Sequence, residues 1–445
     1  MIELDHSPAD LVRPDGSGTR TLAPVLVEGS VARVVGHELE VRGLRLRLGD
    51  AIEIRGVDGP RLAEVVAVEA VGATALVYGD TSGLGRGDRV RRLDSVPGAV
   101  VGPALIGRVV DALGVPMDGG APITGQAVRL EANTPPAMER RRIDTPITTG
   151  VRIIDTLCTI GKGQRVGIFG GSGVGKSTLL GMLAKGQQAD VAVVGLIGER
   201  GREVREFIED ELGPDGLARS IVIVATSDQP ALLRLRAARY ATRVAEFFAD
   251  QGNDVVLMMD SVTRLAMAQR EVGLAAGEPP TARGYTPSVF SMLPKMLERA
   301  GPRRVGTITA LYTVLVDGDD MNDPVADAVR GILDGHLILD RKLAVQGRYP
   351  AIDPLASLSR LAQKLWNDKQ MRVATATRDA LAAAAEVQEL VEVGAYVAGS
   401  NPRADKGLRV APQLVEFLKQ RPTDLTSSER AWQALSDICT RGELL

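Results

Sequence analysis

The sequence predicts an α/β protein built from three parts: a small antiparallel β-barrel or sandwich, a parallel sheet covered by helices, and a helical carboxyl-terminal domain. Three observations predict this fold class. Before about residue 97, short Val, Leu and Ile runs alternate with polar residues and are broken by glycine. After it, continuous apolar runs are mostly separated by helix-length segments, and beyond about residue 366 the chain is rich in Ala and Glu. A chain of 445 residues is longer than one typical domain, so several domains are expected.

The amino-terminal end divides into a tail and a first domain. Residues 1–22 are polar and rich in Pro, Gly and Asp, and they contain too few periodic apolar residues to fold alone, so we expect a mobile tail. In residues 23–97, apolar and polar residues alternate between glycines spaced roughly eight to twelve positions apart, which is typical of short antiparallel strands. This pattern leaves the choice between a barrel and a sandwich open.

The middle of the chain, 98–365, has the pattern of a parallel sheet. Five apolar runs in it lack polar alternation, and a strand without alternation is buried on both faces. Most of these runs are separated by segments long enough for a helix. The five predicted strands are RVGIFGG (165–171), VAVVGLIG (191–198), IVIVAT (221–226), VVLMMD (255–260) and TITALYTVLV (307–316).

Helices are predicted by spacing within this domain and by composition after it. Between two of the runs, six apolar residues recur at steps of three, four or one and end before Gly252, which predicts one helix with a single buried stripe. The six residues are Leu233, Ala237, Tyr240, Val244, Phe247 and Phe248. Residues 366–445 predict helices and no clear strand.

The composition of the chain argues against some classes of partner and against an oxidising compartment. A net charge of −3 argues against a surface that neutralises nucleic-acid phosphates, and 3% aromatic residues leave few rings for base stacking, so no nucleic-acid partner is expected. Cys158 and Cys439 are too few for a disulfide framework, so we expect packed thiols in a reducing compartment. Because the amino terminus lacks a secretory signal and no apolar run approaches the roughly 18 residues of a spanning helix, we expect a cytoplasmic protein.

The most specific motif is GGSGVGKST (170–178), which follows a predicted strand and precedes a predicted helix. It matches the pattern G-x-x-x-x-G-K-[ST], in which glycines turn backbone N–H groups onto phosphate oxygens at a helix amino terminus. The motif predicts a nucleotide-phosphate site where Lys176 reaches the outer phosphates and Ser177 offers a hydroxyl to Mg²⁺. The residues predicted to bind nucleotide are Gly170, Gly171, Ser172, Gly173, Val174, Gly175, Lys176, Ser177 and Thr178.

Two further carboxylates fit a hydrolytic site. Asp260 ends the run VVLMMD, where a carboxylate at the carboxyl edge of a strand can hold the shell of a magnesium ion. Glu199 and Glu203 follow another buried run, and Glu199, at its end, is better placed to orient an attacking water. The alternative interpretation of Glu199 is a surface salt bridge to Arg200 or Arg202.

Longer stretches around these motifs resemble one family. They are GERGREVREFIEDELG, ATSDQPALLRLRAARYATRVAEFFADQG, MMDSVTRLAMAQREVGLAAGEPP, ITALYTVLVDGDDMNDPVADAVRGILDGH and YPAIDPLASLSR. Together they resemble the export ATPases of flagellar and type III secretion systems (the flagellum-specific ATP synthase family), which are relatives of the catalytic subunits of F-type and V-type rotary ATPases. The likeness covers almost the whole chain from about residue 23. It implies a RecA-like P-loop NTPase core between an N-terminal β-barrel and a C-terminal helical domain.

The resemblance also implies roles for single residues. Glu199 would be the catalytic carboxylate, Arg200 a phosphate-side group, and Asp260 the aspartate of the magnesium shell. Tyr349 would pack against adenine. Arg360 would be an arginine finger that enters the site of a neighbouring subunit, which implies a ring of six copies.

Arg264 would belong to the network around this site. The implied activity is Mg-dependent ATP hydrolysis that energises protein export, with ATP/ADP and Mg²⁺ as cofactors. The implied partners are a stator-like regulatory protein, a central-stalk protein, the membrane export gate and chaperone–substrate complexes, so the protein would associate peripherally with an inner-membrane export apparatus. LEVRGLRLRLGD and GAYVAGSNPRADKGL look more like the flagellar branch than the injectisome branch.

Four alternatives stay open at this point. An injectisome ATPase shares all the motifs. A rotary ATP synthase catalytic subunit is disfavoured by GERGREVREF and DSVTRLAMAQRE, and a non-catalytic ring subunit is disfavoured by Glu199. A hexameric RNA translocase is disfavoured because the predicted barrel lacks an aromatic, basic face.

Overall fold

The structure is a computed structural model that describes residues 27–94, 96, 99–186, 188–316 and 320–445. It also describes the backbone of two short strands, β1 (Val12–Pro14) and β2 (Arg20–Leu22), which pair antiparallel and were not predicted. The rest of the predicted mobile tail, 1–22, lies outside the described residues, as does Pro97.

The chain forms two compact units. One comprises residues 1–98, 229–233 and 268–289, and the other comprises 99–228, 234–267 and 290–445. The domain limits predicted at residues 23, 98 and 366 stay predictions.

The first unit contains a closed six-stranded antiparallel barrel in the order β3-β4-β7-β6-β5-β8. Its strands are β3 (Gly29–Val35), β4 (Glu38–Arg42), β5 (Ala51–Gly56), β6 (Gly59–Glu69), β7 (Gly72–Val77) and β8 (Arg89–Leu93). Alternate residues point inward, as a two-residue period requires, and the core is made of small and branched apolar side chains. This core includes Val31, Leu39, Val41, Ile52, Ile54, Val65, Ala75 and Val90. The choice between barrel and sandwich is therefore settled for a barrel.

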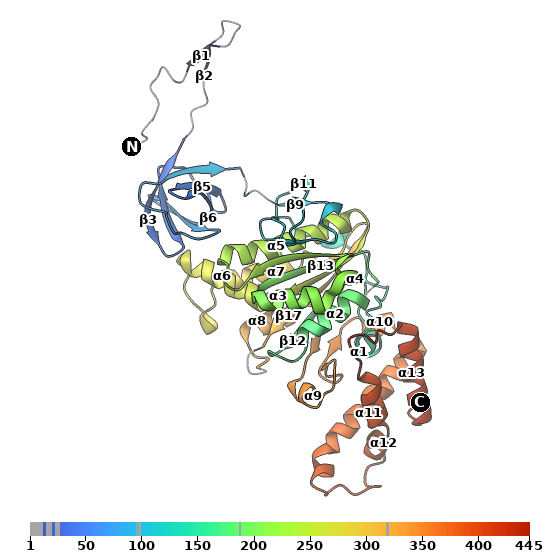
Figure 1. Ribbon diagram of the computed structural model, residues 1–445. Helices are drawn as coiled ribbons and strands as arrows, with labels where there is room; N and C mark the ends of the chain where they lie inside the picture. The colour runs from blue at the N-terminus through green and yellow to red at the C-terminus, as the bar shows by residue number, and fades with distance from the viewer. Residues whose placement is uncertain are drawn as a thin grey trace. The chain divides into compact units, whose positions relative to one another are not determined.

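The second unit is built on one sheet, in the order β10-β14-β13-β15-β17-β12-β18-β19, which helices flank in Figure 1. All five predicted strands are confirmed, as β12 (Arg165–Gly170), β13 (Val191–Glu199), β14 (Ser220–Thr226), β15 (Asp254–Asp260) and β17 (Thr307–Leu315). They run parallel, and residues 191–198 of β13 are all buried, so both faces of that strand are covered.

Several short strands complete the second unit and were not predicted. β10 (Val109–Asp111) and β18 (Gly335–Ile338) extend the parallel sheet, while β19 (Leu358–Ser359) and β16 (Gly301–Pro302) pair antiparallel with it. β9 (Val100–Val101) and β11 (Gln126–Ala127) form a separate pair. None is long enough for a periodic signal in the sequence.

The helices of the middle region connect these strands. They are α1 (Arg152–Leu157), α2 (Lys176–Gly186), α3 (Gly201–Glu206), the π-helix η4 (Phe207–Leu212), α4 (Gly213–Leu217), α5 (Ala231–Asp250), α6 (Val262–Ala275), α7 (Pro287–Leu297), α8 (Pro324–Ile332), α9 (Arg341–Val345) and α10 (Ala362–Leu365). The described residues also contain the single 3-10 turns η2 (Pro103–Leu105), η3 (Ala137–Glu139) and η5 (Ala282–Gly284). In the part of the chain that the structure describes, no helix is both long and apolar enough to cross a membrane.

Helix α5 is the helix predicted by spacing. Five residues of its predicted stripe are buried, but Phe247 is only partly buried, so the stripe is wrong at that position. Phe247 and Phe248 are consecutive, and consecutive side chains point about 100° apart around a helix, so only one of the two lies on the stripe. The two rings still contact each other edge to face, with centroids 5.2 Å apart.

The carboxyl-terminal region is helical, as predicted: α11 (Asp368–Glu392), α12 (Pro402–Leu418) and α13 (Ser428–Arg441), with no strand in 366–445. Each helix begins at a residue whose side chain accepts hydrogen bonds from the first-turn N–H groups, namely Asn367, Asn401 and Ser427. Cys158 and Cys439 are free and buried, as predicted.

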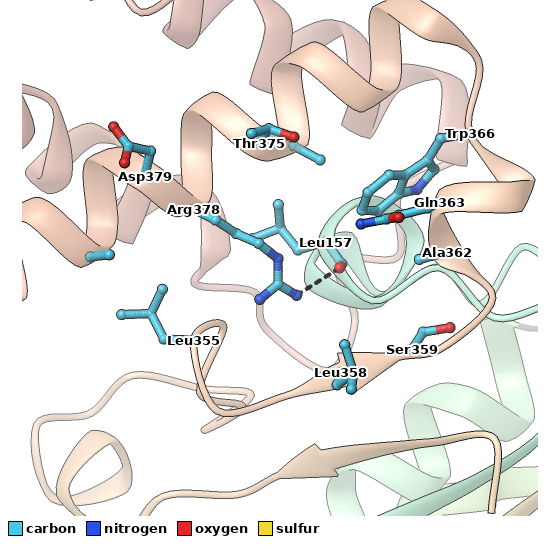
Figure 2. Close-up of a pocket in the computed structure, with 12 residues that line it drawn as sticks. Leu157, Leu355, Leu358, Ser359, Ala362, Gln363, Trp366, Thr375, Arg378 and Asp379 are labelled. Carbon is cyan, nitrogen blue, oxygen red and sulfur yellow. Dashed lines mark hydrogen bonds between the residues drawn. The ribbon is translucent and has the colours of Figure 1, made fainter.

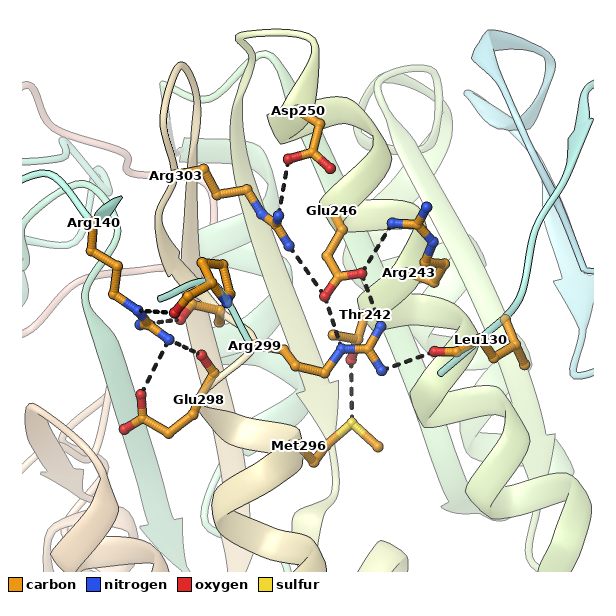
Figure 3. Close-up of polar contacts among 12 residues, drawn as sticks. Leu130, Arg140, Thr242, Arg243, Glu246, Asp250, Met296, Glu298, Arg299 and Arg303 are labelled. Atoms are coloured by element: carbon orange, nitrogen blue, oxygen red, sulfur yellow. Dashed lines mark hydrogen bonds and ion pairs between the residues drawn. The ribbon is translucent and has the colours of Figure 1, made fainter. Parts of the chain in front are cut away.

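A buried carboxylate in α5 is the centre of a polar network that joins this helix to the segments around residues 299–303 and Leu130. Glu246 is fully buried and receives two hydrogen bonds from Arg299, at 2.8 and 2.9 Å. Arg303 and Arg243 also lie within 3.2 Å of its oxygens (Figure 3). Arg299 in turn donates to the carbonyl of Leu130 at 3.0 Å.

We expect Glu246→Gln to destabilise the protein by about 3–5 kcal/mol, because it leaves the buried Arg299 without its counter-charge. The fall in the thermal unfolding midpoint measures the effect. Asp250→Asn is the matched control: Asp250 pairs with Arg303 at 2.9 Å, but its side chain is 51% exposed, so a change below about 1 kcal/mol is expected. An equal fall in both variants would contradict the assignment of Glu246 as the centre of the network.

Candidate active site

The phosphate loop and the two predicted carboxylates meet at one edge of the sheet. The loop joins the end of β12 to the start of α2, Glu199 is the last residue of β13, and Asp260 is the last residue of β15. β13 and β15 are neighbours, and Leu196 lies opposite Asp260 in their register. Since the strands are parallel, their carboxyl ends share one edge, which is where open α/β sheets bind ligands.

The loop has the backbone that the glycines predict. Gly173 and Gly175 have φ angles of 77° and 89°, in the left-handed region that favours glycine. Ser172, Gly173 and Ser177 are exposed, so this face of the loop is open to a ligand. Tyr349 is 44% exposed and its ring lies against the loop, because a Cβ on Gly175 would come within 3.3 Å of Tyr349 Cε1.

Lys176 is the main electrostatic feature of the site. Its Nζ is buried, and among the described residues nothing accepts a hydrogen bond from it. Burial lowers the pKa of the ammonium group, while the negative charges of Asp260 and Glu199 oppose that shift. A buried cation without an acceptor is costly, so this geometry provides a site for an anionic oxygen.

The two carboxylates differ in their surroundings. Asp260 is buried and accepts a hydrogen bond from Thr313 Oγ1 at 2.6 Å; burial raises its pKa. Burial, the charge of Asp260 and a hydrogen bond with Glu203 raise the pKa of Glu199 to about 8. Glu199 therefore holds its proton more tightly than an ordinary glutamate does. Sequence reasoning missed Thr313, whose signal was a threonine inside an apolar run.

Several arginines lie near the carboxylates of the site. Arg200 Nη1 lies 3.2 Å from Glu203 and Arg202 Nη1 lies 2.5 Å from Glu206. In the part of the chain that the structure describes, the alternative salt bridge from Glu199 to either arginine is not formed. Arg264 packs against the end of β13, where a Cβ on Gly198 would come within 2.8 Å of its Cβ.

Arg264 also acts on the site through its charge, which opposes the rise in the pKa of both Glu199 and Asp260. Thr178 is engaged by the protein, because its hydroxyl donates to Glu211 Oε1 at 2.6 Å.

Arg360 does not lie at the phosphate loop of its own chain. Its backbone N–H donates to Asp334, whose N–H donates to Arg165, the first residue of β12. The loop begins at Gly170, five residues further along the strand, or about 16 Å at roughly 3.3 Å per residue. The Arg360 side chain is exposed at this distant edge, with its Nη2 3.4 Å from the carbonyl of Arg330.

A pocket of about 480 Å³ lies beside the same edge and contains no residue of the phosphate loop (Figure 2). Leu355, Leu358 and Trp366 line it together with α11 residues. Arg378 crosses it and donates to the carbonyls of Pro354, Leu157 and Ser357 at 2.6, 2.9 and 3.2 Å. These bonds join α11 to the sheet domain, so the pocket belongs to the packing between them.

The raised pKa of Glu199 predicts a pH-dependent effect of Glu199→Gln on stability. A carboxyl group whose folded pKa is about 8 and whose unfolded value is 4.5 stabilises the fold fully below pH 4.5, and this contribution is lost as the pH rises through 8. Glutamine mimics the protonated form at every pH. We therefore expect the unfolding midpoint of nucleotide-free Glu199→Gln to exceed that of the wild type by a margin that widens from pH 5 to pH 9; a constant margin would contradict the shift.

Family profiles match three consecutive regions. Residues 31–94 match the "ATP synthase alpha/beta family, beta-barrel domain", and residues 150–359 match the "ATP synthase alpha/beta family, nucleotide-binding domain". Residues 366–437 match the "T3SS EscN ATPase C-terminal domain". The last match favours the secretion branch over a rotary ATP synthase subunit.

Similar proteins agree with this assignment. The flagellum-specific ATP synthase of Bacillus subtilis (strain 168) is 50% identical over 414 residues, 92% of this chain and 94% of the relative. The type 3 secretion system ATPase of Xanthomonas euvesicatoria is 50% identical over 421 residues, 94% of this chain and 95% of the relative. The assembled ATPase EscN in complex with its central stalk EscO, from the enteropathogenic E. coli type III secretion system, has a TM-score of 0.85 at 43% identity, covering 92% of this chain and 99% of that chain.

These matches confirm the predicted fold class, a RecA-like P-loop core between an N-terminal β-barrel and a C-terminal helical domain. They span both secretion systems and nearly the full length of the chain. The chain belongs to the family of flagellar and type III secretion export ATPases.

Proposed function

We propose that this ATPase uses Mg²⁺ and ATP at the loop 170–178 to energise protein export through a flagellar type III secretion apparatus. The observation that carries the proposal is the buried Nζ of Lys176, which has no acceptor among the described residues and is influenced by the charges of Asp260 and Glu199. An outer phosphate of ATP supplies the missing acceptor.

The other groups of the site are proposed to bind phosphate, hold Mg²⁺, activate water and contact adenine. Glycine amides of the loop bind phosphate oxygens, and the hydroxyl of Ser177 and the carboxylate of Asp260 are the hard oxygen donors that Mg²⁺ prefers. Mg²⁺ held by these two groups would neutralise charge on the phosphates. Glu199 orients the attacking water and accepts its proton, a role suited to a carboxylate whose pKa is near the working pH. Tyr349, beside Gly175 with an exposed ring, is proposed to pack against adenine.

We further propose that the active unit is a homohexamer in which Arg360 completes the site of a neighbouring copy. Arg360 is exposed and too far from its own loop to serve it, and a ring of head-to-tail interfaces brings one edge of each copy to the next. Arg200, exposed beside Glu199, is proposed as a phosphate-side group. The assembled EscN supports a self-assembled form.

The proposed partners are a central-stalk protein, a stator-like regulator, the membrane export gate and chaperone–substrate complexes, at the cytoplasmic face of the inner membrane. The complex of EscN with its stalk supports the first of these. Identity does not separate the two systems, since both relatives are 50% identical. The flagellar assignment rests on LEVRGLRLRLGD (39–50) and GAYVAGSNPRADKGL (394–408).

A chromosomal Lys176→Ala replacement in the source organism tests the proposal. With protein level unchanged, we expect flagellar filament protein to disappear from the culture supernatant and swimming to stop, while other secreted proteins persist. Loss of a different secreted set with intact flagella would reassign the protein to an injectisome. No change in either would refute the export function.

A further inference from the structure

The segment after Glu199 forms one continuous helical run that reaches from the carboxylates to the phosphate-loop helix. α3 passes into η4 without a break, because Glu206 and Phe207 both have right-handed helical φ and ψ angles. Near its start Glu203 bonds to Glu199, and near its end Glu211 contacts α2. The run ends where Gly213 adopts a φ angle of 64°.

Glu211 contacts α2 at two positions one turn apart. The hydroxyl of Thr178, two residues after Lys176, donates to Glu211 Oε1 at 2.6 Å. At Gly181, a Cβ would come within 2.9 Å of both the Cβ and the carbonyl oxygen of Glu211. Only glycine permits this approach, and the hydrogen bond to a carboxylate is of the stronger, charge-assisted kind.

The π-helical turn places Glu211 on this surface. Gly213 N–H donates to the carbonyl of Ile208, five residues earlier, as in a π-helix. In a continuous α-helix each residue turns by about 100°, so one extra residue per turn shifts every later side chain to a different face. Phe207 and Leu212 stay buried while Glu211 faces α2, and π-helical turns occur frequently at functional sites.

We infer that Glu211 is a positioning residue for ATP hydrolysis, which acts through Thr178 to hold the first turn of α2, and with it Lys176, in register with Glu199. This inference rests on the proposed function. In this proposal Glu211 acts on α2 through Thr178, and not on the nucleotide or the attacking water. Its loss is therefore expected to disturb the alignment of the reacting groups more than the binding of ATP.

Steady-state hydrolysis by the full-length protein, with ATP and Mg²⁺ at protein concentrations that support assembly, tests the inference. Thr178→Val and Glu211→Ala are each expected to lower kcat about tenfold, since small displacements of catalytic groups produce losses of this size or larger. The KM for ATP stays within about twofold of the wild type, because both changes keep the backbone N–H groups through which the loop 170–178 binds phosphate. Thr178→Ser and Glu211→Gln keep a donor and an acceptor, so both retain most of kcat.

The double variant distinguishes positioning from general damage. Because both residues act through one hydrogen bond, Thr178→Val with Glu211→Ala should be no slower than the slower single variant. Asp210→Ala, an exposed neighbour in the same turn, is the matched control and should keep wild-type kcat. Rates are compared below the lowest unfolding midpoint of the set, so that loss of folded protein cannot imitate the effect.

Wild-type kcat in Glu211→Ala, multiplicative losses in the double variant, or equal losses in Glu211→Gln and Glu211→Ala would each overturn the inference. Failure of the proposed function has a different signature. In that case Lys176→Ala would hydrolyse ATP as fast as the wild type, whatever Glu211→Ala does.

Discussion

Lys176→Met is expected to abolish ATP hydrolysis and, in the nucleotide-free protein, to raise the unfolding midpoint. Hydrolysis falls by at least about a hundredfold because a cation aimed at the developing phosphate charge is lost. Stability rises because the buried Nζ has no acceptor among the described residues, and methionine fills a similar volume without a charge to desolvate. The same amine thus destabilises the nucleotide-free protein and is required for hydrolysis.

Thermal unfolding with and without ATP measures both effects in one experiment. The wild-type midpoint should rise on adding ATP with Mg²⁺, while the variant, which starts higher, should respond weakly. Lys185→Met, at an exposed position in the last turn of the same helix, is the control and should change neither rate nor midpoint. A lower midpoint for nucleotide-free Lys176→Met would contradict the view that this amine is a destabilising, ligand-seeking group.

Arg360→Ala is expected to reduce hydrolysis about a thousandfold by itself and to recover activity when mixed with Lys176→Met before assembly. Arg360→Ala keeps an intact phosphate loop, and Lys176→Met keeps an intact Arg360. In a random equimolar ring, about a quarter of the interfaces pair an intact loop with an intact arginine, so about a quarter of wild-type activity should return.

The control is a mixture of Lys176→Met with the double variant Lys176→Met, Arg360→Ala, which contains no intact loop and should stay inactive. Mixed assembly is verified with two differently sized affinity tags. Mixed rings without recovered activity would show that Arg360 does not act between copies.

The strands and the loop were predictable because their signals are local. A continuous apolar run such as VAVVGLIG, or a nucleotide motif between a strand and a helix, depends on residues that are neighbours in the sequence. β10 and β18 were missed because three or four residues are too few to show a hydrophobic periodicity. These segments are strands because they pair with β14 and β12, which are distant in the sequence.

The missed site residues are those whose role depends on contacts far apart in the sequence. Thr313 meets Asp260 across two neighbouring strands, and Glu211 meets Thr178 only because a π-helical turn rotates it toward α2. No spacing rule foresees an inserted turn. Arg360 was assigned through family resemblance, and its distance from its own loop became visible only in the sheet order.

The strand edges of the barrel and of the main sheet protect this molecule against edge-to-edge aggregation. A closed barrel has no free edge, and the sheet of the second unit ends in β10 and β19, which are three and two residues long. Short or absent edges offer little unpaired backbone to which another chain could add a strand. Copies of this chain can therefore meet through side chains without pairing their sheets edge to edge.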